Sequence, residues 1–201
     1  MPHMNPLIAL PTYPVMPGVL AVRFWTPRCA QQLAHMAKSN PSWRCSPQQM
    51  VTRAETICRY IVSDASELYF TSFSQANPGR NGSEIRQIGE VEYRDMDGNH
   101  RGAFWWDAET GHLLQASQVL RDESRFTGHL TSKQAATVSL YWLDKLQIAP
   151  EQTWRVGSTL ECNQGEWKCE FLSANIRVHI TLRASDGQLV FAQSEGGRVP
   201  V

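Results

Sequence analysis

The chain has 201 residues, of which 42% are hydrophobic and 19% charged, a balance typical of a globular protein with a buried core. Its formal net charge is zero, which argues against a nucleic-acid partner, because nucleic-acid-binding surfaces carry a basic excess. The sequence contains no run of about 18 apolar residues, so we expect no membrane span.

Residues 1–44 are predicted to form an N-terminal extension. Its apolar stretch contains three prolines and follows no Lys or Arg, so it is a poor signal peptide and favours a cytoplasmic protein. The alternative is an exported protein whose signal has been removed. Thr26-Pro27 predicts the start of a short helix, and the extension is expected to cover part of a sheet or a strand edge.

Five cysteines without a CxxC motif argue against a disulfide framework or a zinc ribbon. Cys58, Cys162 and Cys169 fall at core-facing positions of the predicted elements and are interpreted as small buried hydrophobic residues. A disulfide between Cys29 and Cys45 requires an oxidising compartment, and the sequence leaves that pairing open.

Two helices are predicted to begin with the same capping pattern. Residues 46–49 read Ser-Pro-Gln-Gln, in which Ser caps, Pro suits the first helical position and Gln completes a capping box. Residues 131–134, 85 positions later, offer the same box. The positions that follow at helical spacing are also 85 apart, and they are apolar except for Ser139. They are Met50, Ala54, Ile57, Cys58 and Ile61 in the first helix, and Ala135, Ser139, Trp142, Leu143 and Leu146 in the second.

The strands that follow the helices repeat at an offset of 76. Residues 89–116 align with residues 165–192 without a gap, and eight of these 28 positions are identical, against about two expected by chance. Period-two alternation predicts strands with one buried and one wet face. The predicted inward residues are Val91, Tyr93, Phe104 and Trp106 in the first copy, and Trp167, Cys169, Ile180 and Leu182 in the second.

A further strand is predicted ahead of each aligned segment, at residues 67–73 and 153–162. The breaker-rich stretch 75–83 is interpreted as an insertion of about nine residues that explains the two offsets. Asp97-Gly98, Thr110-Gly111 and Asp186-Gly187 predict hairpin turns.

The fold class predicted from these elements is α+β, with two tandem helix-plus-antiparallel-sheet repeats at residues 45–120 and 131–197. Each repeat alone has a marginal core. The two are therefore expected to pack together, either side by side or through their sheets.

The segment from Trp106 to Leu114, which runs through Asp107, Thr110 and Gly111 into an apolar strand, resembles the end of a PepSY domain. The second copy departs from this pattern, with Arg183 and Asp186 at the Asp and Thr positions. The resemblance implies a cystatin-like, non-enzymatic fold and a role in binding or inhibiting a peptidase. It also implies export, in conflict with the poor signal sequence.

Four residues are candidates for a binding face. Alternation places Trp105 on the outer face between inward neighbours, and exposed Trp is enriched at binding hot spots. The alternative is that Trp105 packs against the other repeat or the N-terminal extension. Arg101 and Arg177 are expected at equivalent outer positions, where they either line a binding face or keep the strands soluble, and His179 is expected beside Arg177.

We assign no catalytic residue, no metal ligand and no cofactor. Residues 95–99 resemble a calcium loop faintly but lack its third oxygen ligand and its final Glu, so a hairpin turn is favoured. The histidines do not form a zinc-binding motif, and no phosphate loop or nucleophile elbow appears.

The predicted function is a non-enzymatic binding or peptidase-inhibitory module of PepSY-like type. The alternative is a structural protein that pairs with a second copy through its sheets. An enzyme is the third and least favoured class, because the predicted inward positions are almost wholly apolar.

Overall fold

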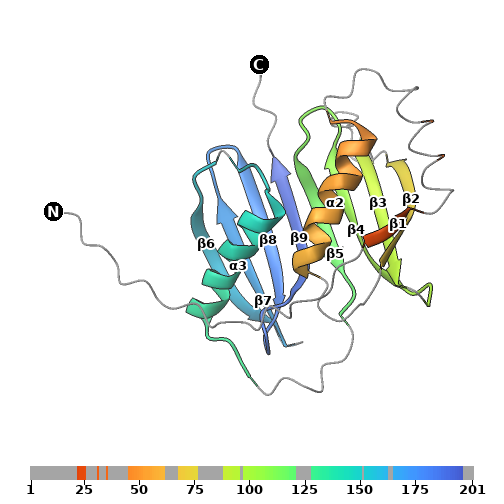
Figure 1. Ribbon diagram of the computed structural model, residues 1–201. Coiled ribbons are helices and arrows are strands. Elements are labelled where there is room, and N and C mark those ends of the chain that lie inside the picture. The colour runs from red at the N-terminus through yellow and green to blue at the C-terminus, as the bar shows by residue number, and fades with distance from the viewer. Residues whose placement is uncertain are drawn as a thin grey trace.

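Two helices lie on one face of a nine-stranded sheet in the computed structural model (Figure 1). The structure describes residues 22–25, 31, 35, 45–61, 68–76, 88–95, 97–120, 128–150, 152–162 and 165–196. The fold class is therefore α+β, as predicted. The predicted start of the extension's helix, Cys29 and most of the stretch 75–83 lie outside the described residues.

Each half of the molecule is a helix followed by four strands. The first half comprises α2 (Pro47–Ile61), β2 (Leu68–Ala76), β3 (Ile88–Asp95), β4 (His100–Asp107) and β5 (Leu113–Gln118). The second half comprises α3 (Ser132–Leu146), β6 (Arg155–Cys162), β7 (Glu166–Leu172), β8 (Ile176–Arg183) and β9 (Leu189–Gly196). A short strand from the N-terminal extension, β1 (Val22–Trp25), pairs parallel to β2 at the sheet edge.

The two halves join through their last strands. The strand order is β1-β2-β3-β4-β5-β9-β8-β7-β6, so the halves run outward in opposite directions from the antiparallel pair β5–β9. Ala116 lies opposite Ala192 in this pair, and these are the two residues that the sequence aligns with each other. Of the two packing modes expected from the sequence, the halves use the one through their sheets.

Both helices begin at the predicted capping boxes. The hydroxyl of Ser46 accepts from the backbone N–H of Gln49 at 3.2 Å, and the Gln49 side chain accepts from the Ser46 N–H at 2.8 Å. Thr131 and Gln134 make the same reciprocal pair at 3.3 and 2.9 Å. These bonds satisfy backbone donors that the first helical turn leaves without partners. Each helix is 15 residues long.

One row of buried side chains crosses the centre of the sheet beneath the helices. Its members are consecutive cross-strand partners that are at most 1% exposed: Val91, Phe104, Ala116, Ala192, Ile180 and Cys169. Tyr93 stacks on Phe104 with ring centroids 5.3 Å apart. The helix positions predicted to face inward are likewise buried, from Met50 to Cys58 and from Ala135 to Leu146. The row and the helix stripes belong to one core that runs through both halves.

The gapless alignment of the two hairpin segments is wrong by two residues in its first strand. Trp106 in β4 lies opposite Gly89, whereas the aligned Leu182 in β8 lies opposite Trp167. The β3–β4 pair also contains a β-bulge between Tyr93 and Arg94, which shifts its register by one further residue toward the turn. Because a shift of two residues keeps every side chain on the same face, the predicted inward positions are nevertheless buried.

Candidate functional site

The outer face of the sheet, opposite the helices, carries a cross-sheet row that brings Trp105 and His179 into line. Its members are consecutive cross-strand partners, and each is partly exposed: Glu90, Trp105, Gln115, Gln193, His179 and Glu170. We call these six residues the outer row. It takes three residues from each half, and its four central members are uncharged or, for His179, titratable.

Trp105 presents an unused hydrogen-bond donor in this row. Its indole nitrogen is buried, and among the described residues no acceptor lies within hydrogen-bond distance of it. The ring lies beside Glu90 and Gln115 on the neighbouring strands. Buried indole N–H groups ordinarily find a partner, so this position is suited to an acceptor supplied from outside.

Arg177 and His179 flank Glu170 at the other end of the outer row. The Nε of Arg177 lies 3.1 Å from a Glu170 carboxylate oxygen, and Ser158 donates to the other oxygen at 3.3 Å. Arg177 is exposed, as predicted. Glu170 therefore pairs with the guanidinium of Arg177 and lies opposite His179 on the neighbouring strand.

Arg101 does not lie on the outer face, so its predicted place in the binding face is wrong. It is 1% exposed, and its guanidinium lies 3.6 Å from the carboxylate of Asp95, which is 6% exposed. The cause is the β-bulge: Tyr93 pairs with Gly102 and Arg94 with His100, which leaves Arg101 between the two pairs. An extra residue in one strand reverses the side-chain alternation beyond it, and sequence alternation alone does not reveal this.

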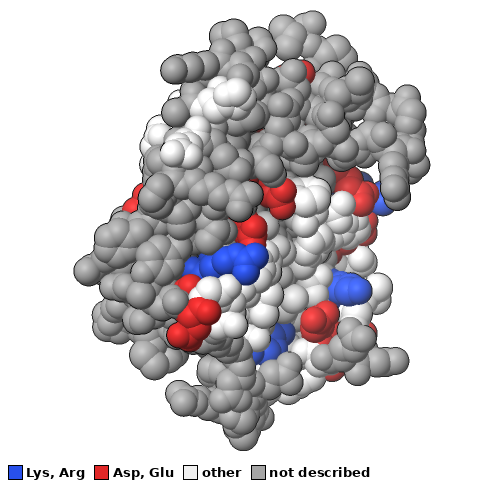
Figure 2. All heavy atoms as spheres, turned by 90° about the vertical axis from the view of Figure 1, so that its right-hand side faces the viewer, with Lys and Arg blue, Asp and Glu red and all other residues white. Residues whose placement is uncertain are grey.

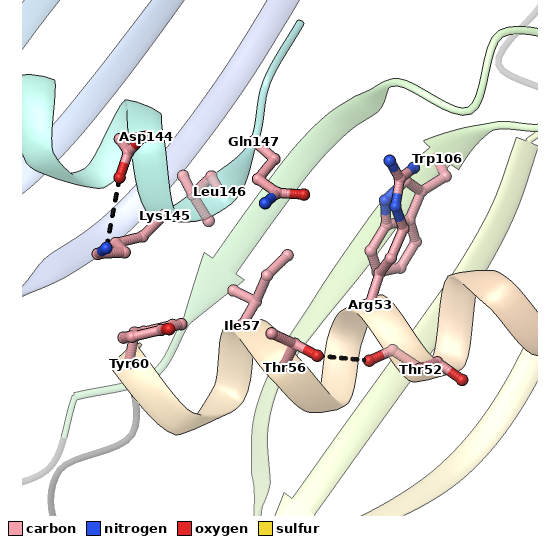
Figure 3. Close-up of a pocket in the computed structure, with 10 residues that line it drawn as sticks. All are labelled: Thr52, Arg53, Thr56, Ile57, Tyr60, Trp106, Asp144, Lys145, Leu146 and Gln147. Atoms are coloured by element: carbon pink, nitrogen blue, oxygen red, sulfur yellow. Dashed lines mark hydrogen bonds and ion pairs between the residues drawn. The ribbon is translucent and has the colours of Figure 1, made fainter. Parts of the chain in front are cut away.

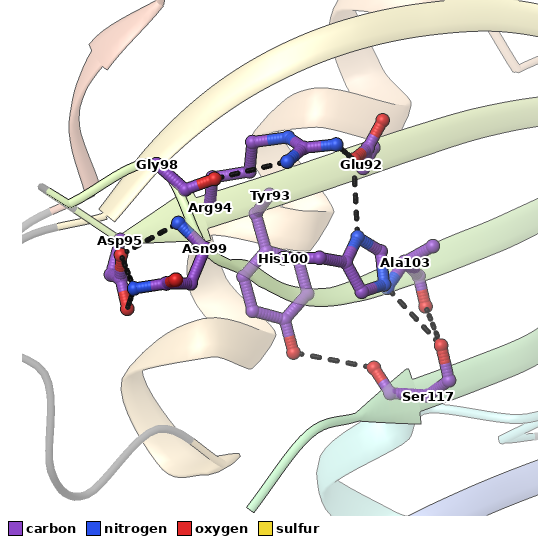
Figure 4. A network of polar contacts seen from close by, with 9 residues as sticks. All are labelled: Glu92, Tyr93, Arg94, Asp95, Gly98, Asn99, His100, Ala103 and Ser117. Carbon is purple, nitrogen blue, oxygen red and sulfur yellow. Dashed lines mark hydrogen bonds and ion pairs between the residues drawn. The ribbon is translucent and has the colours of Figure 1, made fainter. Parts of the chain in front are cut away.

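Polar contacts hold the hairpin that contains this bulge (Figure 4). A carboxylate oxygen of Asp95 accepts from the backbone N–H groups of Asp97 and Asn99 at 3.1 and 3.0 Å, and Asn99 also donates its amide. On the outer side, Glu92 pairs with Arg94 at 2.6 Å and with His100 at 3.1 Å. Asp95 and residues 97–99 thus belong to a hairpin turn, as favoured from the sequence.

A groove on the helix side separates α2 from the end of α3 (Figure 3). It encloses about 200 Å³ and has an apolar floor of Ile57, Trp106 and Leu146. Arg53 and Lys145 are its cationic side chains. Lys145 Nζ lies 5.2 Å from the centre of the Tyr60 ring, across the gap between the helices. Sequence analysis missed this groove, because its floor and walls come from three elements far apart in the chain.

Arg53 also borders a second, more open hollow at the start of α2. This hollow is lined by Cys45, Gln48, Gln49, Thr52, Arg53, Thr110 and Gly111. The guanidinium of Arg53 donates to the carbonyl of Gly111. Arg53 and Thr52 line both hollows, so the two are neighbours along one flank of α2.

The described cysteines are free thiols. Burial raises the pKa of Cys169, against the opposing effect of the nearby Ser139 and Thr159 hydroxyls, and burial raises the pKa of Cys58 well above 9.0. Burial also raises the pKa of Cys45, against the effect of Arg53. Cys162 is only partly buried, so the prediction that it belongs to the core is wrong.

Charged side chains of both signs are interspersed on the described part of the face that carries the β1 edge (Figure 2).

Within the described ranges, no group of three or more His, Cys, Asp or Glu residues converges on a possible metal position. In that same part of the chain, none of the helices is long and apolar enough to cross a membrane.

Comparison with known proteins leaves the family of this chain open. No protein-family model matches the sequence, and no curated protein matches it. Among solved structures, the chain is similar to the Bacillus megaterium YpeB C-terminal domain, with a TM-score of 0.47 and 8% identity. The match covers 74% of this chain and 67% of that one. A similarity of this size carries no inference about fold or function.

Proposed function

We propose that the protein is a non-catalytic binding module formed by two PepSY-like units, which arose by tandem duplication and share one sheet. The common order of elements, the matched capping boxes and the Ala116–Ala192 pair at the centre support a duplication. The Asp107, Thr110 and Gly111 segment supports the PepSY-like assignment of the first unit.

The outer row is the main support for our proposal that a partner protein docks on the outer face of the sheet. The outer row has an uncharged centre and a partly exposed Trp whose indole N–H finds no acceptor among the described residues. This is the composition of a binding hot spot. A peptidase is the class of partner that the PepSY resemblance implies. Docking would cover both halves at once, because the row crosses β5–β9.

The proposal is tested with the full chain against a panel of purified metallopeptidases, measuring inhibition and complex formation by surface plasmon resonance. Trp105→Ala combined with His179→Ala is expected to weaken binding at least 10-fold, because both side chains lie at the docking face. Lys133→Ala is the control, since Lys133 is exposed on α3 at the opposite face. Absence of inhibition and of a complex across the panel would contradict a peptidase target. Equal binding by the double variant would exclude the outer row.

A second candidate is self-association, supported by the exposed edge strand β6. Among the described strands β6 pairs with β7 alone, and it exposes Val156 by 49% and Leu160 by 63%. A β-bulge between Val156 and Thr159 works against pairing of this edge, because irregular edges resist strand addition. Light scattering tests it: a dimer that Leu160→Lys dissociates would favour this function, and a monomer at 100 μM would exclude it.

A further inference from the structure

The first strand of each half, β2 or β6, contains a β-bulge at the same place. The bulge of β2 follows Phe70, which lies opposite Tyr93, and the bulge of β6 follows Val156, which lies opposite Phe171. Tyr93 and Phe171 in turn pair with residues of β4 and β8 that are 76 positions apart, as in the alignment of the two halves. The two bulges are therefore equivalent, and position 156 corresponds to position 70.

Only the first half has a strand beside this bulged edge. Val22, Phe24 and Trp25 of β1 lie opposite residues 68–70, immediately ahead of the bulge, in a parallel pair. β1 also contacts α2. The equivalent residues of the second half are 154–156, and among the described strands β6 has β7 as its one neighbour. The bulge that works against pairing along the whole of β6 thus leaves room for a short parallel strand ahead of it, as β2 demonstrates.

Exposed apolar side chains lie at the open edge on the helix side of the sheet. Val156 is 49% exposed, although its partner Phe171 is in the core. Leu140 of α3 is 42% exposed. Lys145 of the same helix lies over the Tyr60 ring of α2, and Leu140 is about 140° away from Lys145 around the helix, on the flank toward β6. A strand added to β6 would cover Val156 and pack beside Leu140, as β1 packs beside α2.

We propose that the edge of β6 at residues 154–156 binds an extended segment of a partner protein. The segment pairs parallel to β6 and has aromatic side chains, as β1 does with its sequence Val-Arg-Phe-Trp. Its backbone hydrogen bonds to the edge provide affinity, and a side chain laid between Val156 and Leu140 provides specificity. The site lies at the sheet edge, so it is independent of docking at the outer row.

The test uses the ¹⁵N-labelled full chain and a synthetic peptide with the sequence of residues 20–26, acetyl-Leu-Ala-Val-Arg-Phe-Trp-Thr-amide. We expect the peptide to shift the amide signals of Arg155, Val156 and Leu140. Absence of shifts in β6 at millimolar peptide would overturn the proposal. Shifts confined to residues 68–70 would also overturn it, because they would show that the peptide exchanges with β1 in the first half.

A control peptide separates strand pairing from simple hydrophobic contact. It has proline in place of Val22 and Arg23, so it keeps both aromatic rings but lacks two consecutive backbone donors, one of which must face β6. We expect it to bind at least about 10-fold more weakly, and equal affinity of the two peptides would overturn the proposal. A nitroxide at the N-terminus of the first peptide reports the orientation. Parallel pairing should broaden Thr153 more than Leu160, and the reverse would contradict a parallel strand.

Three variants locate the site. Val156→Lys places a charge where the added strand must lie, and it should weaken peptide binding at least about 10-fold. Leu140→Lys should also weaken binding, because it changes the helix flank beside the added strand. Leu160→Lys is the matched control: Leu160 is 63% exposed but lies beyond the bulge, opposite Lys168 on the outer face.

Leu160→Lys should leave the peptide affinity unchanged, and the same variant is expected to dissociate a dimer formed through β6. It therefore distinguishes this site from self-association. Unchanged affinity in both Val156→Lys and Leu140→Lys would overturn the proposal, as would an equal loss in Leu160→Lys.

Discussion

The two halves of the molecule form the same arrangement with different large side chains. In the first half Trp106 lies opposite Gly89, and in the second half Trp167 lies opposite Leu182. In the first half the Trp of this pair is in β4, and in the second half it is in β7. The strand equivalent to β4 is β8, which has Leu182 at that position. Cores tolerate such exchanges when the total volume is kept. The comparison shows that the backbone of a half does not require one particular set of packing residues.

At the helices one large side chain has no counterpart in the other half, and the surfaces of the two halves differ there. Trp142 in α3 has no aromatic counterpart in α2, and a groove opens beside Ile57 instead. In the second half the Trp167 indole donates to the Leu130 carbonyl at 3.0 Å, which fixes the chain entering α3. The helix of the second half therefore packs an indole where the helix of the first half carries the smaller Ile57, and the groove lies on the Ile57 side.

The largest expected difference between the halves follows truncation of Trp142. Trp142→Ala removes a buried indole and its hydrogen bond to Gly187, and it should lower the free energy of unfolding by about 4 kcal/mol. Ile57→Ala should lower it by about 2 kcal/mol, because Ile57 already borders open space. Urea unfolding of both variants measures these losses. Equal losses of unfolding free energy would show that Trp142 and Ile57 are equally well packed.

The aligned arginines Arg101 and Arg177 should differ next most. Arg101→Ala leaves the buried carboxylate of Asp95 without its cation, and it should destabilise by about 3 kcal/mol. Arg177→Ala breaks an exposed ion pair with Glu170 and should cost less than about 1 kcal/mol. Thermal unfolding compares the two variants, and a small effect of Arg101→Ala would contradict the buried pair.

The two helix caps should contribute equally to stability. Ser46→Ala and Thr131→Ala each remove one acceptor for a first-turn N–H group, and each should destabilise by about 1 kcal/mol. Chemical denaturation of the two variants should give losses that agree within about 0.5 kcal/mol. A loss confined to one variant would show that the two capping boxes are not energetically equivalent.

The smallest expected effect is a loss of stability at alkaline pH. Burial raises the pKa of Cys58 well above 9.0, so the folded state keeps this thiol neutral where the unfolded chain ionises it. The stabilisation is fully present below pH 9.0 and is lost as the pH rises through the folded pKa. Urea unfolding from pH 7 to 10.5 should show this decline, and Cys58→Ala should make it shallower. An unchanged slope in the variant would assign the decline to other groups.

The sequence alone determined the helix starts, the buried stripe of each helix and the inward residues of the strands. These features depend on local capping and on side-chain periodicity, which the order of residues records directly. Trp105, Arg177 and His179 were placed on one face by the same alternation. Arg101 was misplaced, because a β-bulge depends on how two strands pair and not on either strand alone.

Only the tertiary structure decided how the halves join and where the groove lies. Pairing of β5 with β9 brings together strands that are more than 70 residues apart in the sequence, and it aligns the outer row across the molecule. The groove depends on the volume left between α2, α3 and β4, which neither helix determines alone. Periodicity determines the face on which a side chain lies, whereas packing between elements determines whether that face is filled.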